Sequence, residues 1–322
     1  MFCTVYLLLL LAVPAAWVAR PLAERLAPRT ATWLLTATAG TLAAASSAAL
    51  MLLALTGLLR TTAVASFGHW SVRVLRDGTP GTRLIPLLAG AALVSAAVAT
   101  TRALRRRLRA QRTAAREAAC LPARNGLSVV EDPSADAFAI PGSATLAAPG
   151  GRIVVSTGML AALTPEEVSV LVAHERAHLR ARHHRFVMVA QLAATANPLL
   201  RPLARHVSYT VERWADEEAA RATGDRRRVA RTIGKAALAR QRTAVRARAP
   251  RIALHLTGPS AAAGPIPRRV AALLEPPHRG ARAQPLIPAL TALLVTAALL
   301  CCADAAHDVQ RLLQAAHQSD SR

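Results

Sequence analysis

Four long stretches without charged residues constrain this sequence more than any other feature. Each approaches or exceeds the roughly 20 helical residues that cross a hydrocarbon core of about 30 Å. They cover residues 2–19, 31–59, 84–101 and 286–303. The chain is 53% hydrophobic but only 3% aromatic, a composition that disfavours an ordinary soluble enzyme. We therefore predict a mainly α-helical integral membrane protein with four transmembrane helices, a multi-pass protein of the cell membrane.

The first apolar stretch is predicted to be an anchor and not a signal peptide. No basic residue precedes residues 2–19, whereas Arg20, Arg25 and Arg29 follow them, the reverse of the charge order in a signal peptide. The four cysteines form neither a disulfide framework nor a paired metal motif. They are expected to be small apolar packing residues.

The arginines around the third apolar stretch predict the orientation of the chain. Arg76 and Arg83 precede this stretch, whereas six arginines follow it within residues 102–112. Lys and Arg near the ends of spans are retained on the cytoplasmic side. We therefore expect the N-terminus outside and residues 102–285 in the cytoplasm.

The expected domains follow from these spans: three transmembrane helices in residues 1–101, a cytoplasmic domain in 102–285, a fourth helix in 286–303 and a short extracellular tail in 304–322. Residues 102–285 carry 31 Lys and Arg against 13 Asp and Glu, and so hold 18 of the 22 net positive charges. Such a domain should be attracted to the anionic head groups of a lipid bilayer. No direct nucleic-acid partner is expected, because no aromatic platform or recognition motif accompanies the charge.

The first part of the cytoplasmic domain has the pattern of a small antiparallel sheet. Short apolar runs separated by Pro and Gly occupy residues 127–130, 137–140, 144–147 and 152–156. Helices should follow. Thr164, Pro165 and Glu167 predict the start of the first one, with an N-cap, a first-turn proline and a glutamate at the third position. Further helices are expected over residues 186–196, 202–223, 225–248 and 266–274.

His174, Glu175 and His178 form a HExxH motif within the first of these helices, the context that the motif requires. Because histidines four residues apart lie on one face of a helix, both imidazoles can bind one Zn²⁺ at about 2.0–2.1 Å. Glu175 lies beside them, where it can take a proton from a metal-bound water. The motif predicts one zinc ion per chain and a catalytic role for Glu175.

Glu212 is the predicted third zinc ligand, 34 residues after His178 on another helix. Asp216 lies one turn further on the same face, where it can accept a hydrogen bond from a ligating imidazole. Both could instead be solvated helix carboxylates, but the nearby HExxH motif favours the site. If residues 186–200 crossed the membrane, Glu212 would lie on the opposite side from the histidines, so this apolar helix is predicted to be buried or membrane-skimming.

For four other residues near the motif, the spacing gives weaker evidence of a role in the site. His183 and His184 follow His178 by five and six residues, a spacing that predicts side chains pointing away from the metal face. Tyr209 and His206 precede Glu212 by about one and two turns. Either could donate a hydrogen bond to a transition state, or pack as an ordinary helix residue.

The motifs carry a family resemblance. Residues 156–160 (STGML), 163–167 (LTPEE) and 171–178 (LVAHERAH) resemble the core of the BlaR/MecR family of membrane zinc metallopeptidases. Residues 136–142 (DAFAIPG) and 212–216 (ERWAD) are similar to patterns in the related HtpX-like and CAAX-processing membrane peptidases.

The resemblance implies a zincin-like domain that acts as a membrane-bound endopeptidase on a protein or peptide. In the BlaR/MecR family that substrate is typically a transcriptional repressor or the peptidase itself. The resemblance also implies that residues 144–156 offer a sheet edge to which an extended substrate adds as a strand. Only residues 304–322 follow the last predicted span, so we expect no antibiotic-sensing domain there.

Two other functions stay open. An HtpX-like peptidase would degrade damaged membrane proteins, although the order of three spans, catalytic domain and one span favours the BlaR/MecR arrangement. A catalytically silent membrane scaffold could keep the fold without the chemistry. The presence of both Glu175 and Glu212 disfavours that second alternative.

Overall fold

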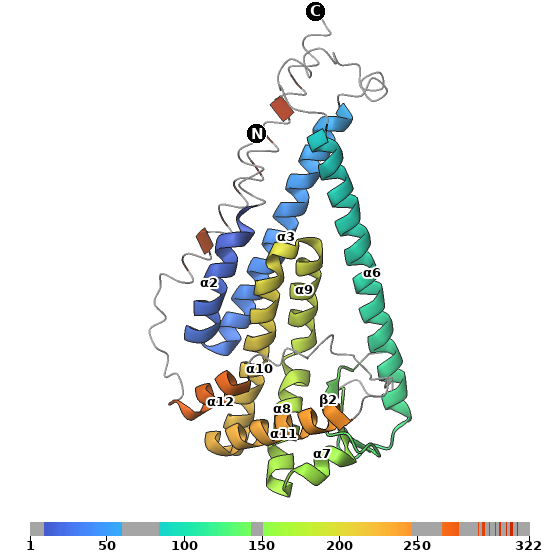
Figure 1. Cartoon of the computed structure of the whole chain (residues 1–322), viewed down its shortest axis with the longest axis vertical. Coiled ribbons are helices and arrows are strands. Elements are labelled where there is room, and N and C mark those ends of the chain that lie inside the picture. Colours follow the sequence, from blue (N-terminus) through green and yellow to red (C-terminus); the bar gives the residue numbers. More distant parts are fainter. Residues whose placement is uncertain are drawn as a thin grey trace, which may run out of the picture.

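A computed structural model describes residues 10–59, 84–142, 151–246 and 266–276, with isolated positions between 289 and 314. These residues form a mainly helical structure with one small sheet. In Figure 1 the helices α2, α3, α9 and α10 stand side by side, while α6 leans away from them. The sheet and the helices α7, α8, α11 and α12 gather at one end of this group.

Two of the described helices are long and apolar enough to cross a membrane. They are α3 (Pro28–Leu59) and α6 (Leu84–Cys120), which contain the second and third predicted spans. The first predicted span lies only partly in α2 (Ala12–Arg25), because residues 1–9 are outside the described part. Nearly all of residues 286–303 are outside it as well. The described part of the chain therefore contains two candidate spans.

Helix α6 continues without interruption from its apolar half into the arginine-rich segment that follows. The sequence predicts a span over residues 84–101, and the structure extends this span to Cys120 as one helix of 37 residues. At 1.5 Å per residue this helix is about 55 Å long. No proline or glycine lies between residues 91 and 120, so nothing in the sequence breaks it.

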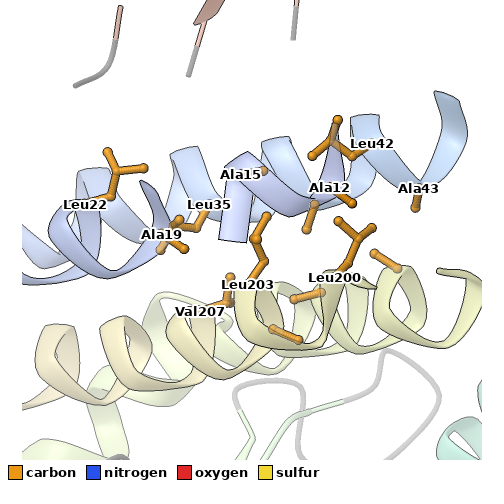
Figure 2. Packing of buried hydrophobic residues seen from close by; sticks show 14 of the residues in the cluster. Ala12, Ala15, Ala19, Leu22, Leu35, Leu42, Ala43, Leu200, Leu203 and Val207 are labelled. Atoms are coloured by element: carbon orange, nitrogen blue, oxygen red, sulfur yellow. The ribbon is translucent and has the colours of Figure 1, made fainter. Parts of the chain in front are cut away.

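The largest apolar core lies between the pair α2 and α3 and the hairpin of α9 (His183–Ala196) and α10 (Arg201–Thr223). Figure 2 shows buried leucines and alanines of α2 and α3 facing Leu200, Leu203 and Val207 in this layer. A short 3₁₀ turn, Pro198–Leu200, joins α9 to α10. Just before it, the buried Asn197 amide donates a hydrogen bond of 2.9 Å to the Ser46 hydroxyl of α3. The apolar helix predicted over residues 186–196 thus packs alongside a candidate span, with Phe186, Ala190 and Ala193 buried and Val189 40% exposed.

The sheet is mixed, and the prediction of an antiparallel sheet was therefore partly wrong. Its strands are β1 (Leu127–Val130), β2 (Ala137–Ile140) and β3 (Arg152–Ser156), in the order β1-β3-β2. β3 pairs antiparallel with β2 but parallel with β1, because the chain reverses twice before β3 and so returns to the direction of β1. The fourth predicted run, residues 144–147, lies outside the described residues.

Two capped helices follow the sheet and position the candidate site. The Ser156 hydroxyl accepts a hydrogen bond from the Met159 amide at the start of α7 (Thr157–Ala162). Thr164 and Glu167 form a complete capping box at the start of α8 (Pro165–Arg180), as the sequence predicts. These caps satisfy backbone amides that the first helical turn would leave unpaired.

The helices α11 (Arg226–Arg246) and α12 (Ile266–Leu274) cross the base of α10 (Figure 1). Gly224 adopts a positive φ of 71° and ends α10, a conformation in which glycine has no steric penalty. The sequence predicts a short helix over residues 266–274, and α12 confirms it. Leu273 of α12 packs in a buried cluster with Val170 of α8 and Ala219 of α10, so α12 is fixed against both site-bearing helices.

Candidate metal centre

The two histidines of the HExxH motif face one another across a single turn of α8. The Nε2 atoms of His174 and His178 are 3.1 Å apart, and His174 and Glu175 are buried. The i, i+4 spacing places both rings on one helix face. The face points toward α10, which packs against α8.

Glu212 of α10 completes a group of three potential metal ligands with these histidines. Its Oε2 atom lies 3.7 Å from His174 Nε2 and its Oε1 atom lies 3.7 Å from His178 Nε2. All three ligand atoms fall within 4.8 Å of one another. Tetrahedral zinc with ligands at about 2.0–2.1 Å would place neighbouring ligand atoms about 3.3 Å apart. The three side chains therefore fit a zinc ion with little rearrangement.

Asp216 lies beside Nδ1 of His174, the ring nitrogen that does not face His178 and Glu212. Its Oδ1 atom lies 3.0 Å from His174 Nδ1, and its side chain is almost completely buried. A carboxylate at Nδ1 keeps the proton on that nitrogen and leaves Nε2 free for a metal. The structure thus brings together all five residues that the sequence singles out for the site.

His183 also belongs to the site, although its spacing predicts that it points away. Its Nδ1 atom lies 3.1 Å from His178 Nδ1, and it is only 1% exposed. The cause is the turn after α8, where Arg182 adopts a left-handed conformation with φ 53°. Helical spacing therefore stops at Arg180, and the chain returns the imidazole of His183 to that of His178.

Arg269 of α12 is a second residue that the sequence interpretation missed. Its guanidinium contacts Asp216 through two nitrogens, at 2.8 and 2.6 Å, and Glu212 through a third, at 2.9 Å. The sequence contains one indication that Arg269 is buried. Arg269 and Leu273 are four residues apart and so lie on the same face of the short helix, and an apolar residue such as Leu273 marks the buried face.

Burial and nearby charges give the imidazoles of His174 and His178 different pKa values. Burial lowers the pKa of His174, but the nearby carboxylates of Asp216 and Glu212 outweigh burial and raise the pKa to about 10. Burial lowers the pKa of His178 to about 4, since Glu212 compensates only in part. Burial also lowers the pKa of His183, to about 2. Metal ligation requires neutral imidazoles, so His174 must lose a proton when a metal binds.

The carboxyl groups of Glu175, Glu212 and Asp216 also differ in pKa. Burial raises the pKa of Glu175 to about 7. Burial alone would raise the pKa of Glu212 and of Asp216 too, but the adjacent Arg269 and the histidines hold both pKa values below the usual range. The site therefore has two ionised carboxylates at neutral pH beside a third that can gain or lose a proton.

Neither of the two proposed transition-state donors is brought into this group by a described contact. The Tyr209 ring lies under the guanidinium groups of Arg268 and Arg213, at 4.9 and 5.9 Å. His206 and His184 are partly buried, and burial lowers the pKa of both. The charges of Arg269 and Asp216 also act on Tyr209, and the donor role of Tyr209 or His206 stays a prediction.

Two histidines and a glutamate around one point, with a second glutamate next to the first histidine, form the arrangement of a metallopeptidase active site. Comparison with known families agrees with that class. The model of Peptidase family M48 matches residues 99–194, which include the sheet, α7, α8 and most of α9. The match supports a metallopeptidase and ends before Glu212. No curated protein and no solved structure matches the chain.

Proposed function

We propose that this chain is a membrane-bound zinc metalloendopeptidase that hydrolyses peptide bonds in a protein substrate. The observation that carries the proposal is the convergence of His174 and His178 from α8 with Glu212 from α10. The similarity of residues 99–194 to Peptidase family M48 supports the same activity. Zinc is the preferred ion because two imidazoles and one carboxylate suit its coordination.

The roles of the side chains follow from their positions. His174, His178 and Glu212 hold one zinc ion, and Asp216 and His183 orient the two imidazoles. When bound, Zn²⁺ supplies Lewis acidity toward the substrate carbonyl and lowers the pKa of a nearby water. Glu175 takes the proton of the attacking water and gives it to the leaving amine nitrogen. A pKa near 7 suits a group that must both accept and release a proton at neutral pH.

An extended substrate would bind beside α8 by adding to the sheet. Among the described strands β3 is central, paired on both sides, so it cannot offer the edge expected within residues 144–156. β2 is an outer strand and packs against α8. Main-chain hydrogen bonds to β2 would therefore lead a substrate toward the metal ligands.

The membrane arrangement proposed with this activity has four spans, an outside N-terminus and a cytoplasmic catalytic domain over residues 102–285. The exposed apolar side chains of α6 support a lipid environment. Leu87, Leu88 and Val94 are 62–69% exposed, and water would solvate such a surface poorly. The regulatory role, in which the substrate is a transcriptional repressor or the peptidase itself, rests on the motif resemblance alone.

The test compares detergent-purified wild type with Glu175→Gln, using Glu166→Gln as a matched control. Glu166 lies on the same helix but is exposed. We expect wild type and both variants to bind about one zinc per chain. Wild type and Glu166→Gln should cleave casein, whereas Glu175→Gln should lose cleavage by at least about 100-fold.

The same preparations distinguish the alternative functions. Cleavage of the Glu175→Gln protein by wild type, at a single site, would support self-processing. Cleavage of unfolded proteins without that site would favour quality control. A wild type that binds no zinc and shows no Glu175-dependent cleavage would leave only the silent scaffold.

A further inference from the structure

We propose that Arg269 is a positioning residue that holds the carboxylates of Glu212 and Asp216 in their metal-binding orientation. This inference rests on the proposed function. It makes α12, which follows α11 by some twenty residues of chain, a part of the active site. No motif assigned a role to this residue.

The contacts of Arg269 match the fork of a guanidinium group to two carboxylates at once. Its Nε and Nη2 atoms donate to Asp216 Oδ2 and Oδ1, at 2.8 and 2.6 Å. Its Nη1 atom lies 2.9 Å from Glu212 Oε2. Arg269 is 5% exposed, so these contacts are made away from solvent, where they are strong and directional.

The guanidinium of Arg269 binds one of the two oxygens of the Glu212 carboxylate. It contacts Oε2, which also lies 3.7 Å from His174 Nε2, while Oε1 lies 3.7 Å from His178 Nε2. The contact restricts the orientation of the carboxylate beside both histidines and leaves Oε1 free of the guanidinium. Asp216 Oδ1 lies between Arg269 and His174 Nδ1, so the same guanidinium also fixes the carboxylate that orients His174.

Helix α12 is anchored independently of these contacts. Arg226 of α11 donates to the carbonyl oxygens of Leu273 and Ala272, at 3.1 and 3.0 Å. Arg268 forms an ion pair with Glu24 at the end of α2. Because other residues hold α12 in place, Arg269 reaches the site with its direction already set.

A different role would be charge compensation alone. Two buried carboxylates need positive charge nearby, and any cation could supply it. A lysine would then replace Arg269 without loss. If the role is positioning, lysine should fail, since one ammonium group on a flexible chain cannot make three fixed contacts to two carboxylates.

The experiment measures the zinc affinity of the full-length purified protein by competition with a chelator, and kcat/KM on casein. It compares wild type, Arg269→Lys, Arg269→Gln and the control Arg227→Gln, which changes an exposed arginine of the neighbouring helix α11. Thermal unfolding with and without EDTA checks that each variant is folded. If Arg269→Gln does not fold, Arg269→Lys, which keeps the charge, carries the test.

We expect both Arg269 variants to bind zinc roughly 10–100-fold more weakly than wild type, and Arg227→Gln to match wild type. An Arg269→Lys protein with the zinc affinity and kcat/KM of wild type would overturn the inference. Zinc affinity can be measured even without peptidase activity. Failure of the proposed function, with zinc bound but nothing cleaved, is therefore distinct from failure of the inference.

Discussion

The carboxyl group of Glu175 links the chemistry of the site to the stability of the fold. Burial raises its pKa from 4.5 to about 7, so the folded, metal-free protein binds this proton more tightly than the unfolded chain. The tighter binding of this proton therefore adds to the free energy of unfolding. The contribution is complete below about pH 4.5 and is lost as the pH rises through about 7.

The pH dependence of stability should therefore change in Glu175→Gln. For metal-free protein in EDTA, the free energy of unfolding of the variant should rise relative to wild type between pH 5 and pH 8. The shift corresponds to at most roughly 3 kcal/mol. Denaturant titrations at both pH values measure it. A constant difference between the two proteins would show that Glu175 has an ordinary pKa.

His183 should control the affinity of the site for zinc through His178. In His183→Ala the Nδ1 atom of His178 loses its partner, and we expect about tenfold weaker zinc binding. His183→Asn should restore much of the affinity, because an amide oxygen can accept the same hydrogen bond. Chelator competition measures both variants.

His184→Ala is the control for this change, since His184 is the neighbouring histidine and is only partly buried. Equal zinc affinity in His183→Ala and wild type would mean that the contact with His178 is incidental.

The sequence could predict those residues of the site that helical geometry connects. His174 and His178 lie on one helix, and Glu212 and Asp216 on another, so their spacing predicts a common face. His183 could not be predicted from spacing, because a left-handed residue interrupts the helix before it. Arg269 could not be predicted because its partners are 53 or more residues away, and only the packing of α12 brings them together.

At the scale of elements, Gly158 determines how closely α7 approaches the loop after β1. A Cβ at this position would lie 2.3 Å from the Pro133 carbonyl oxygen and 2.8 Å from that of Ser134. Backbone atoms cannot move away as a flexible side chain could.

Gly158→Ala should therefore destabilise the protein, by about 1–3 kcal/mol as for other overpacked sites. Gly234→Ala is the matched control, because Gly234 lies within α11 with open space around its Cβ position. There alanine should stabilise the helix by about 0.4–1 kcal/mol. Chemical denaturation of both variants gives the comparison, and equal effects would contradict the close approach at Gly158.

The elements themselves show which parts of a fold are encoded locally. The bounds of β1, β2 and β3 match the predicted apolar runs, because Pro and Gly delimit each run. The capping box fixes the start of α8 in the same local manner. The parallel pairing of β1 with β3 depends on contacts between distant segments, so local patterns could not reveal it.

At the scale of the whole molecule, the exposed apolar face of α6 and the cysteine at its end allow a test of orientation. Cys120 is a free, exposed cysteine in the predicted cytoplasmic domain. In a variant with Cys3, Cys301 and Cys302 changed to serine, a membrane-impermeant maleimide should label Cys120 only after the cells are permeabilised.

Adding Ser319→Cys to a variant that also carries Cys120→Ser places the single cysteine in the predicted extracellular tail. That protein should be labelled in intact cells. Labelling of Cys120 in intact cells would place the metal site on the outer side of the membrane and reverse the proposed topology.

The ion pair between Arg269 and Asp216 also has a consequence for biosynthesis. Asp216 leaves the ribosome before Arg269 has been added, since 53 residues separate them in the chain. Until then the carboxylates of Asp216 and Glu212 lack the guanidinium that orients them. A nascent chain would therefore carry a metal site whose carboxylates are not yet oriented until α12 has been synthesised.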